Sequence, residues 1–409
     1  MDLDKNLEKY ADLLVSVGLN LKSGDNLAIR MTEDCLPLVR HIAKKAYQRG
    51  VKDIRLEFGD DSITLDRFLY GSDDAIGYYP DYVVDYMEKL FQDHHHVLSL
   101  VAPDPDLLKP VDPARIARWQ KVAGMAAKRI QHYTMENEVK WCVAGVACPA
   151  WAKAAYPQLP AEEALAKLWE NIFMATRVDQ EDPVKAWWEH DAALKRRQDF
   201  LNNARFEKLH YHGPGTNLEV YLVPNHIWVG GSGFSKDGDV FMANIPTEEI
   251  FCMPHADKVN GTLRARMPLS VRGQIVDKFH FTFKDGQVVD FGAEVGQQIL
   301  ADLLEMDEGA KRLGEAALVA HNSPISNTGI LFKNTLFDEN ASCHFALGAA
   351  YSENLEGSTE RSNEENRKLG MNDSMIHVDF MVGGPDVTVT GIKSDGSDIV
   401  LLKDGEWQV

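Results

Sequence analysis

The sequence has few cysteines and no long apolar run, and both absences narrow the class of protein. No hydrophobic stretch approaches the roughly 20 residues that a membrane-spanning helix needs. Residues 1–18 mix acidic, basic and apolar side chains and lack the basic and apolar segments of a secretory signal. The 5 cysteines are odd in number and widely scattered, whereas disulfide frameworks use paired cysteines in small secreted domains. We therefore expect a cytoplasmic protein with reduced thiols.

Basic residues are scarce relative to acidic ones. The chain has 43 lysines and arginines against 62 aspartates and glutamates, which gives a formal net charge of -19. Nucleic-acid phosphates and anionic membrane surfaces attract basic patches and repel a protein of this charge. We expect neither a nucleic acid nor a membrane among the partners.

The length and the pattern of the first half predict an α/β domain followed by a second domain. A chain of 409 residues exceeds one comfortable hydrophobic core, so we expect two domains, residues 1–200 and 201–409. Strand-like and helix-like segments alternate in the first half, which is typical of an open α/β sheet with helices on its faces. The predicted strands are 26–30, 51–58 and 95–101, and the predicted helices are 36–47, 112–127 and the tryptophan-rich stretch 162–203.

After about residue 206 the sequence favours short strands separated by tight turns. Turns such as 236–238 and 284–286 contain the Asp-Gly pairs that supply positive φ angles to hairpins. The predicted strands are 218–222, 261–267 and 278–283, and one predicted helix covers 293–312. The expected fold class is therefore α/β, with an N-terminal open α/β sheet domain and a β-rich α+β domain that carries the candidate site.

Two polar side chains share one face of a predicted strand near the C-terminus. His377 and Asp379 are two residues apart in an otherwise apolar segment, and alternate residues of a strand point the same way. An imidazole nitrogen beside a carboxylate oxygen is a natural half-site for zinc, cobalt or manganese. The pattern alone also fits a polar strand face at the surface. The apolar neighbours Met375 and Phe380 favour an enclosed pair that needs internal partners.

Further candidate residues precede this strand. Glu339 and His344 are close enough in sequence to reach one centre across a turn, and Tyr351 follows among small residues that leave room beside its hydroxyl. Glu249 and Glu315 each adjoin an apolar run, where an isolated buried charge is unfavourable unless it is paired or binds metal. Structural salt bridges would satisfy the same demand for the glutamates, and a core tyrosine with one hydrogen bond is the alternative for Tyr351.

Taken together, these residues suit a dinuclear metal centre. Two ions roughly 3.5–4 Å apart need about six ligands, including a carboxylate that bridges them. The candidate ligands are Glu249, Glu315, Glu339, His344, His377 and Asp379. Their spacing does not show whether they converge. The sequence lacks the His-Glu-x-x-His helix of common zinc peptidases, and the consecutive histidines 94–96 fit the polar start of a strand better than a metal site.

At these residues the chain resembles the thermophilic-aminopeptidase family of metallopeptidases, of the aminopeptidase T, aminopeptidase S and PepS type. The resemblance runs over essentially the full length and is strongest in segments 244–250, 312–315, 339–351 and 370–381. It implies that Glu249, Glu315, His344, His377 and Asp379 are metal ligands, with Glu339 as a sixth. It also implies that Tyr351 is catalytic, that the protein is a homodimer and that N-terminal residues are accepted broadly.

The predicted function is therefore that of a metalloaminopeptidase with two divalent ions per subunit. The ions would activate water for attack on the N-terminal peptide bond, with Glu315 as a bridging carboxylate and Tyr351 as a hydrogen-bond donor to the oxyanion. The metal is expected to be zinc, cobalt or manganese, and the partners are peptide substrates. The alternatives are a non-catalytic peptide or small-molecule binding protein and another dinuclear metallohydrolase.

Overall fold

The computed structural model describes residues 2–271 and 274–409, which divide into two compact units. The first unit consists of Met1–His190 and Ser232–Pro246, and the second of Asp191–Gly231 and Thr247–Val409. The predicted division at residue 200 differs from this one in two places. The boundary falls inside helix α10 (Pro183–Ala204), and the chain returns to the first unit after residue 231. The sequence pattern did not predict this return, because the returning segment contributes only short strands to the first unit.

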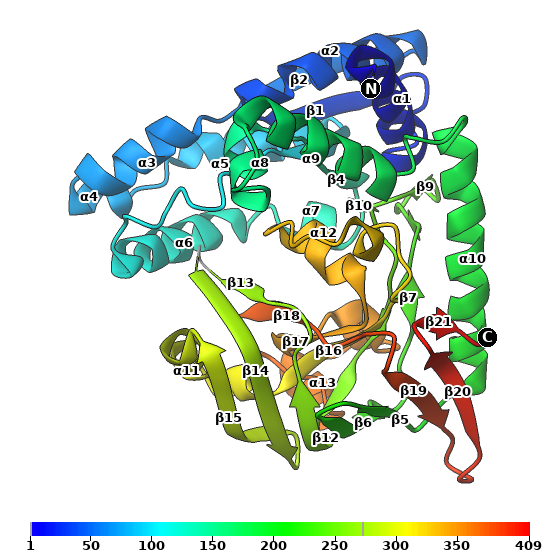
Figure 1. Ribbon diagram of the computed structural model, residues 1–409. Coiled ribbons are helices and arrows are strands. Elements are labelled where there is room, and N and C mark those ends of the chain that lie inside the picture. Colours follow the sequence, from blue (N-terminus) through cyan, green and yellow to red (C-terminus); the bar gives the residue numbers. More distant parts are fainter. Residues whose placement is uncertain (1, 272–273) are drawn as a thin grey trace. The chain divides into compact units, whose positions relative to one another are not determined.

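The first unit contains a parallel sheet with the strand order β10-β4-β3-β1-β2 (Figure 1). Every pairing along this order is parallel. The middle of β1 is fully buried at Leu27, Ala28 and Ile29, as expected for a parallel sheet that is covered on both faces. The strands are β1 (Asn26–Met31), β2 (Asp53–Phe58), β3 (His95–Val101), β4 (Trp141–Gly145) and β10 (Asn244–Ile245), and β8 (Gly233–Phe234) pairs separately with β9 (Val240–Phe241).

Helices connect the strands of this sheet, as the alternating sequence pattern predicts. They are α1 (Leu3–Leu13), α2 (Leu36–Gln48), α3 (Asp61–Tyr70), α4 (Asp73–Ile76), α5 (Asp81–Gln92), α6 (Pro113–Ala127), α7 (His132–Met135), α8 (Pro149–Ala155) and α9 (Ala161–Ala175). None of the helices within the described residues is both long enough and apolar enough to cross a membrane.

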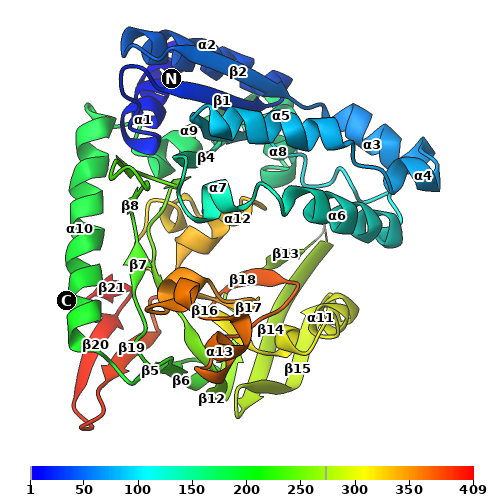
Figure 2. The same cartoon turned by 180° about the vertical axis from the view of Figure 1, so that it is seen from behind.

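The second unit is built around two sheets, which Figure 2 shows from behind. The large sheet has the order β13-β14-β12-β6-β5-β19-β20-β21, with β15 paired to β14. Its strands are β5 (Lys208–Gly213), β6 (Thr216–Leu222), β12 (Pro254–Arg264), β13 (Leu269–Val271), β14 (Gln274–Lys284), β15 (Gln287–Val295), β19 (Thr388–Ile392), β20 (Asp398–Lys403) and β21 (Glu406–Trp407). The helices of this unit after α10 are α11 (Gln297–Leu304), α12 (Thr335–Asp338) and α13 (Asn363–Lys368).

The small sheet is antiparallel and has the order β18-β17-β16-β11-β7. Its strands are β7 (Val229–Gly230), β11 (Ile250–Cys252), β16 (Leu313–Leu318), β17 (His344–Gly348) and β18 (His377–Met381). One face contributes Ile250, Leu318, Phe345 and Phe380 to an apolar core that also contains side chains of the large sheet. We call the opposite face of the small sheet the site face.

The predicted α/β fold class is confirmed, and several predicted elements have different bounds. The stretch 162–203 forms two helices, because α9 ends at Ala175 and α10 begins at Pro183, a residue that suits a helix start. The predicted helix 293–312 contracts to α11, because β15 extends to Val295 and Gly296 follows with a positive φ of 77°. The predicted strand 261–267 is the end of the longer β12.

Candidate metal centre

Strand alternation places Glu315, His344, His377 and Asp379 on the site face. Ala346 in β17 lies between Glu315 in β16 and Asp379 in β18, and Gly348 pairs with His377. The register of β16 shifts between Leu313 and Glu315, so Leu313 belongs to the core although it stands two residues before Glu315. A bulge of this kind redirects a side chain from one face to the other. Here it turns Leu313 into the core, while Glu315 keeps the alternation of Ala317 and faces the histidines.

Two groups of side chains converge, and Glu315 belongs to both. In the first group, His344 Nε2 lies 3.1 Å from Glu249 Oε2 and 3.3 Å from Glu315 Oε1. In the second group, His377 Nε2 lies 3.3 Å from Asp379 Oδ1 and 3.6 Å from Glu315 Oε2. The ligand atoms of each group lie within 4.8 Å of one another. Glu315 therefore directs one oxygen to each group.

Backbone carbonyls fix how the two histidines present their nitrogens. His344 Nδ1 lies 3.2 Å from the carbonyl oxygen of Ser342, and His377 Nδ1 lies 2.7 Å from that of Ala349. A carbonyl accepts only from a protonated nitrogen, so each Nδ1 carries the hydrogen. In the neutral ring Nε2 is then left with its lone pair facing the carboxylates, which is the arrangement found in metal-ligating histidines.

The first group contains an unsatisfied buried atom that a cation would satisfy. His344 Nε2 makes no hydrogen bond of normal geometry to any described residue, although two carboxylate oxygens lie within 3.3 Å. The His344 side chain is 1% exposed and that of Glu315 is 6% exposed. Buried nitrogen and oxygen atoms that converge without alignment for hydrogen bonds are the donor set that a transition-metal ion fits.

When no cation is bound, the closely spaced carboxylates raise the pKa values of several groups at this site. Burial and the nearby carboxylates of Asp379 and Glu249 raise the pKa of Glu315 to about 7, although His344 opposes the change. Burial would lower the pKa of His377, but Asp379 and Glu315 outweigh burial and raise this pKa to about 9. Glu249 and Glu315 likewise raise the pKa of His344 well above its usual value. Without a cation, protons balance part of the carboxylate charge.

Comparisons with known proteins identify the family. The model of the thermophilic metalloprotease (M29) family matches residues 3–407. The chain is 46% identical over 404 residues to Aminopeptidase 2 of Geobacillus stearothermophilus, covering 99% of this chain and 98% of that protein. It is 42% identical over 405 residues to Aminopeptidase T of Thermus aquaticus, covering 99% of both chains. The structure of wild-type AmpT from Thermus thermophilus superposes with a TM-score of 0.94 at 38% identity and covers 100% of both chains.

The chain belongs to the thermophilic metalloprotease (M29) family. The resemblance drawn from the sequence is thereby confirmed, together with the predicted enzyme class, a hydrolase of peptide bonds that uses a divalent metal ion.

Glu339 lies beside the two groups of the metalloprotease without belonging to either. Within the described residues, the groups that meet the distances for a shared ion contain the other five predicted ligands. Burial and the charges of Glu249 and Asp379 raise the pKa of Glu339 well above its usual value. Its carboxyl group is thus within electrostatic reach of the centre.

Tyr351 stands at the edge of the centre and is 41% exposed. Its ring centroid lies 4.6 Å from that of His377 and 6.0 Å from that of Phe251. Burial of the hydroxyl and the carboxylates of Glu315 and Asp379 raise the pKa of Tyr351 above its usual value. The phenol therefore stays protonated at neutral pH and can donate a hydrogen bond.

Two asparagines that the sequence did not single out hold this arrangement in place. Asn340 accepts a hydrogen bond from the backbone N–H of Glu248 at 2.7 Å, which ties the segment before Glu249 to the segment that carries Glu339. Asn354 donates from Nδ2 to the backbone oxygens of Ile227 at 3.1 Å and Phe251 at 3.3 Å. Both asparagines are buried. Their only sequence signal is their position next to Glu339 and shortly after Tyr351.

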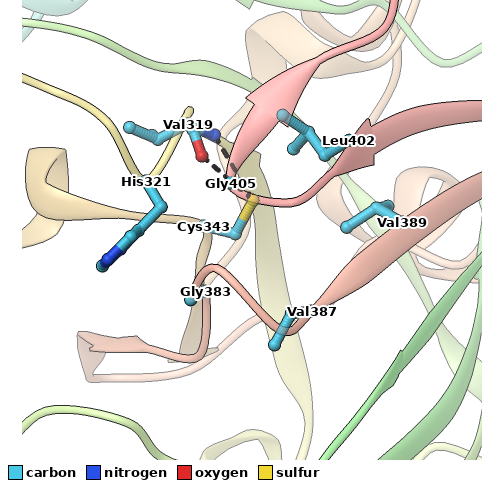
Figure 3. A pocket seen from close by; sticks show the side chains of 9 residues that line it. Val319, His321, Cys343, Gly383, Val387, Val389, Leu402 and Gly405 are labelled. Carbon is cyan, nitrogen blue, oxygen red and sulfur yellow. Dashed lines mark hydrogen bonds between the residues drawn. The ribbon is translucent and has the colours of Figure 1, made fainter.

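A separate pocket lies on the core side of the small sheet (Figure 3). Cys343 Sγ donates a hydrogen bond to the backbone oxygen of Val319 at 3.3 Å, and the pocket is completed mainly by residues such as Val389 and Leu402. None of the six predicted ligands, which all belong to the described residues, lines this pocket. Cys343 immediately precedes His344 but belongs to the apolar core, so this pocket and the metal centre use opposite faces.

Proposed function

We propose that this metalloprotease is an aminopeptidase that works with two divalent metal ions, one in each of the groups that share Glu315. The single observation that supports two sites is the Glu315 carboxylate, which directs Oε1 to His344 and Oε2 to His377. A bridging carboxylate is the usual link between the ions of a dinuclear hydrolase. The relatives named above are aminopeptidases, which supports removal of N-terminal residues as the activity.

The residues of the chain would hold the ions and orient the substrate. Glu249 and His344 are the further ligands of one site, and His377 and Asp379 are those of the other. We assign Glu339 as a sixth ligand, because the charges of Glu249 and Asp379 act on its carboxyl group and a nearby cation would stabilise all three carboxylates. When bound, divalent ions supply a water of lowered pKa and a Lewis acid for the carbonyl group. Nitrogen and carboxylate ligands suit zinc, cobalt or manganese.

Tyr351 would act on the oxyanion that forms when the peptide bond is attacked. Its hydroxyl group remains protonated, and its ring lies against His377 at the edge of the centre. A hydrogen bond from this hydroxyl to the oxyanion would be made mainly in the transition state. Losing one such donor lowers the rate by about 10²–10³-fold. We expect this loss in Tyr351→Phe with unchanged metal content, and near-normal turnover would remove Tyr351 from the mechanism.

Hydrolysis of a leucyl chromogenic amide tests the function. Metal-free protein should be inactive, and addition of zinc, cobalt or manganese should restore release of the dye. Binding of about two ions per subunit, measured by titration with elemental analysis, should accompany full activity. Binding of one ion at full activity would overturn the dinuclear centre, and inactivity with every metal and N-terminal residue would favour a binding protein or another hydrolase.

We also propose a homodimer that works in the cytoplasm. The dimer rests on the family resemblance. The cytoplasmic location rests on the cysteines, of which all five are free and buried. Sedimentation at several protein concentrations would test the dimer, and a monomer at micromolar concentration would contradict it.

A further inference from the structure

The site face has an apolar end as well as a charged middle. Phe251 in β11 pairs with Val229 in β7 on one side and with Ala317 in β16 on the other, and Ala317 pairs with His344 in β17. Residues that pair directly across strands share a face. A row therefore runs from Val229 and Phe251 across Ala317 to His344. Because neighbouring strands are about 4.8 Å apart, Phe251 stands about 10 Å from His344.

Phe251 is linked to Glu249 along the chain and to Tyr351 by contacts in space. It follows Glu249 by two residues, so the same strand direction carries a predicted ligand and an aromatic ring on one face. Its ring meets that of Tyr351 at a centroid distance of 6.0 Å and an angle of 66°. Asn354 donates a hydrogen bond to the Phe251 backbone oxygen and so fixes the segment after Tyr351 on β11. The two rings are held in place before any substrate arrives.

We infer that Val229, Phe251 and the ring of Tyr351 form an apolar wall that receives the side chain of the substrate's N-terminal residue. This inference rests on the proposed aminopeptidase function. It names the favoured substrates as peptides that begin with a large apolar residue such as leucine, methionine or phenylalanine. Phe251 is a specificity-determining residue in this scheme and touches neither ion.

The chemistry of an aminopeptidase explains why the N-terminal side chain reaches this wall. The α-carbon of that residue carries both the free amino group and the scissile carbonyl group, which are drawn to the metal centre. Its side chain must then lie within a few ångströms of the centre. Ala317 and His344 are fully buried in this row, whereas Phe251 is partly exposed and Tyr351 is exposed. An apolar side chain packed against the exposed parts of the Phe251 and Tyr351 rings would remove their apolar surface from water.

Variants of Phe251 test the wall through a ratio of substrates. The readout is kcat/KM for a leucyl amide divided by kcat/KM for an alanyl amide, with the metal-loaded enzyme. We expect Phe251→Ala to lower this ratio by about 10–100-fold, since an apolar pocket discriminates by this amount for a few methylene groups. Phe251→Leu should keep most of the ratio. Phe291→Ala is the matched control, because Phe291 is half-buried in the large sheet of the same unit, and it should leave the ratio unchanged.

Three outcomes would contradict the inferred apolar wall. One is an equal loss for both amides in Phe251→Ala at normal metal content. A second is an effect that follows the second residue in a series of dipeptide amides rather than the first. A third is wild-type enzyme that hydrolyses leucyl and alanyl amides equally, which removes the wall and leaves the aminopeptidase intact. Failure of the wild type to hydrolyse any N-terminal amide would instead remove the proposed function.

Discussion

Two buried charged clusters, one in each unit, use the same residue types in opposite ways. In the first unit, Lys140 is 1% exposed, and its Nζ lies 2.9 Å from Asp25 Oδ2 and 3.5 Å from Asp239 Oδ2. His96 Nε2 lies 3.3 Å from the same oxygen of Asp25. We call these four residues the lysine cluster. It contains its own cation, whereas the carboxylates of Glu249, Glu315 and Asp379 are paired with histidines.

The histidines of the two clusters also carry their hydrogens on different nitrogens. The backbone N–H of Lys140 donates to His96 Nδ1 at 3.1 Å, so this nitrogen carries the lone pair and Nε2 donates to Asp25. At the metal centre, carbonyl oxygens stand beside Nδ1 of His344 and His377 and leave Nε2 as the acceptor. A single backbone group beside the ring thus decides whether a buried histidine supplies a proton or a metal-binding lone pair.

The largest difference between the clusters should appear when a shared carboxylate is neutralised. Glu315→Gln removes a ligand from both groups of the metal centre, so we expect activity to fall by more than about 10³-fold with loss of bound metal. Elemental analysis and amide hydrolysis measure both effects. Glu305→Gln, at an exposed position of the same unit, is the control. Retention of two ions in Glu315→Gln would show that Glu315 does not bridge.

Removal of the Lys140 cation should lower the stability of the folded protein and leave metal binding unchanged. In Lys140→Met the carboxylates of Asp25 and Asp239 lose their buried partner, and breaking such a pair costs about 3–5 kcal/mol. Urea unfolding measures the loss, with Lys121→Met at an exposed position as the control. A loss below about 1 kcal/mol would mean that the lysine cluster tolerates an unpaired carboxylate.

Changes of pH should separate the clusters as well. Metal binding needs unprotonated His377, whose pKa in the metal-free site is about 9, so metal affinity should fall about tenfold per unit as the pH drops from about 9 to 7. Below about pH 7 protonated Glu315 steepens the fall. Isothermal titration with zinc at several pH values measures this slope. An affinity independent of pH would mean that the site binds the ion without releasing a proton.

The lysine cluster should be insensitive over the same interval. Burial would raise the pKa of Asp25, but hydrogen bonds donated by His96, the backbone N–H of Lys22 and Lys140 outweigh burial and lower this pKa. The stability that Asp25 contributes is present above its ordinary pKa and is lost only as the pH falls through the lowered value. Burial lowers the pKa of His96, so its contribution is complete above about pH 7. The measurement is the stability of the metal-free wild type and of metal-free Lys140→Met between about pH 9 and 7. A steep fall in the wild type that is missing in Lys140→Met would contradict this assignment.

The smallest effect is expected from changing the histidine of the lysine cluster. In His96→Asn the amide oxygen can still accept from the backbone N–H of Lys140, while the hydrogen bond to Asp25 is lost, at about 1 kcal/mol of stability. The matched change His344→Asn removes the Nε2 ligand and should abolish binding at one site. Loss of metal from His96→Asn would show that the two clusters are not independent.

Much of the fold followed from the sequence because it depends on local patterns. The alternation of His377 and Asp379 in an apolar segment predicted a shared strand face, and β18 has it. The predicted strand 95–101 coincides with β3, and His95 and His96 at its polar start are buried and paired with aspartates. The roles of the six predicted ligands and of Tyr351 remain proposals, and five of the ligands converge in space.

The parts that escaped prediction depend on pairings between distant segments. The bulge that turns Leu313 into the core beside Glu315 arises from the register of β16 against β17, which no local pattern encodes. Phe251 has the sequence surroundings of an ordinary core residue, and only its pairing with Val229 and Ala317 places it beside the centre. The return of residues 232–246 to the first unit likewise depends on the pairing of β10 with β4.

The origin of the ligands in separate segments has a further consequence. Glu249, Glu315, His344 and His377 come from stretches of chain that are tens of residues apart, so bound ions would act as reversible cross-links that restrict the unfolded chain. A ligand that binds only the folded state adds about 4 kcal/mol of stability at a thousandfold excess over its dissociation constant. A chelator should therefore loosen the second unit much as a reductant loosens a disulfide-linked domain, and resistance to heat would vary with the metal supply of the cell.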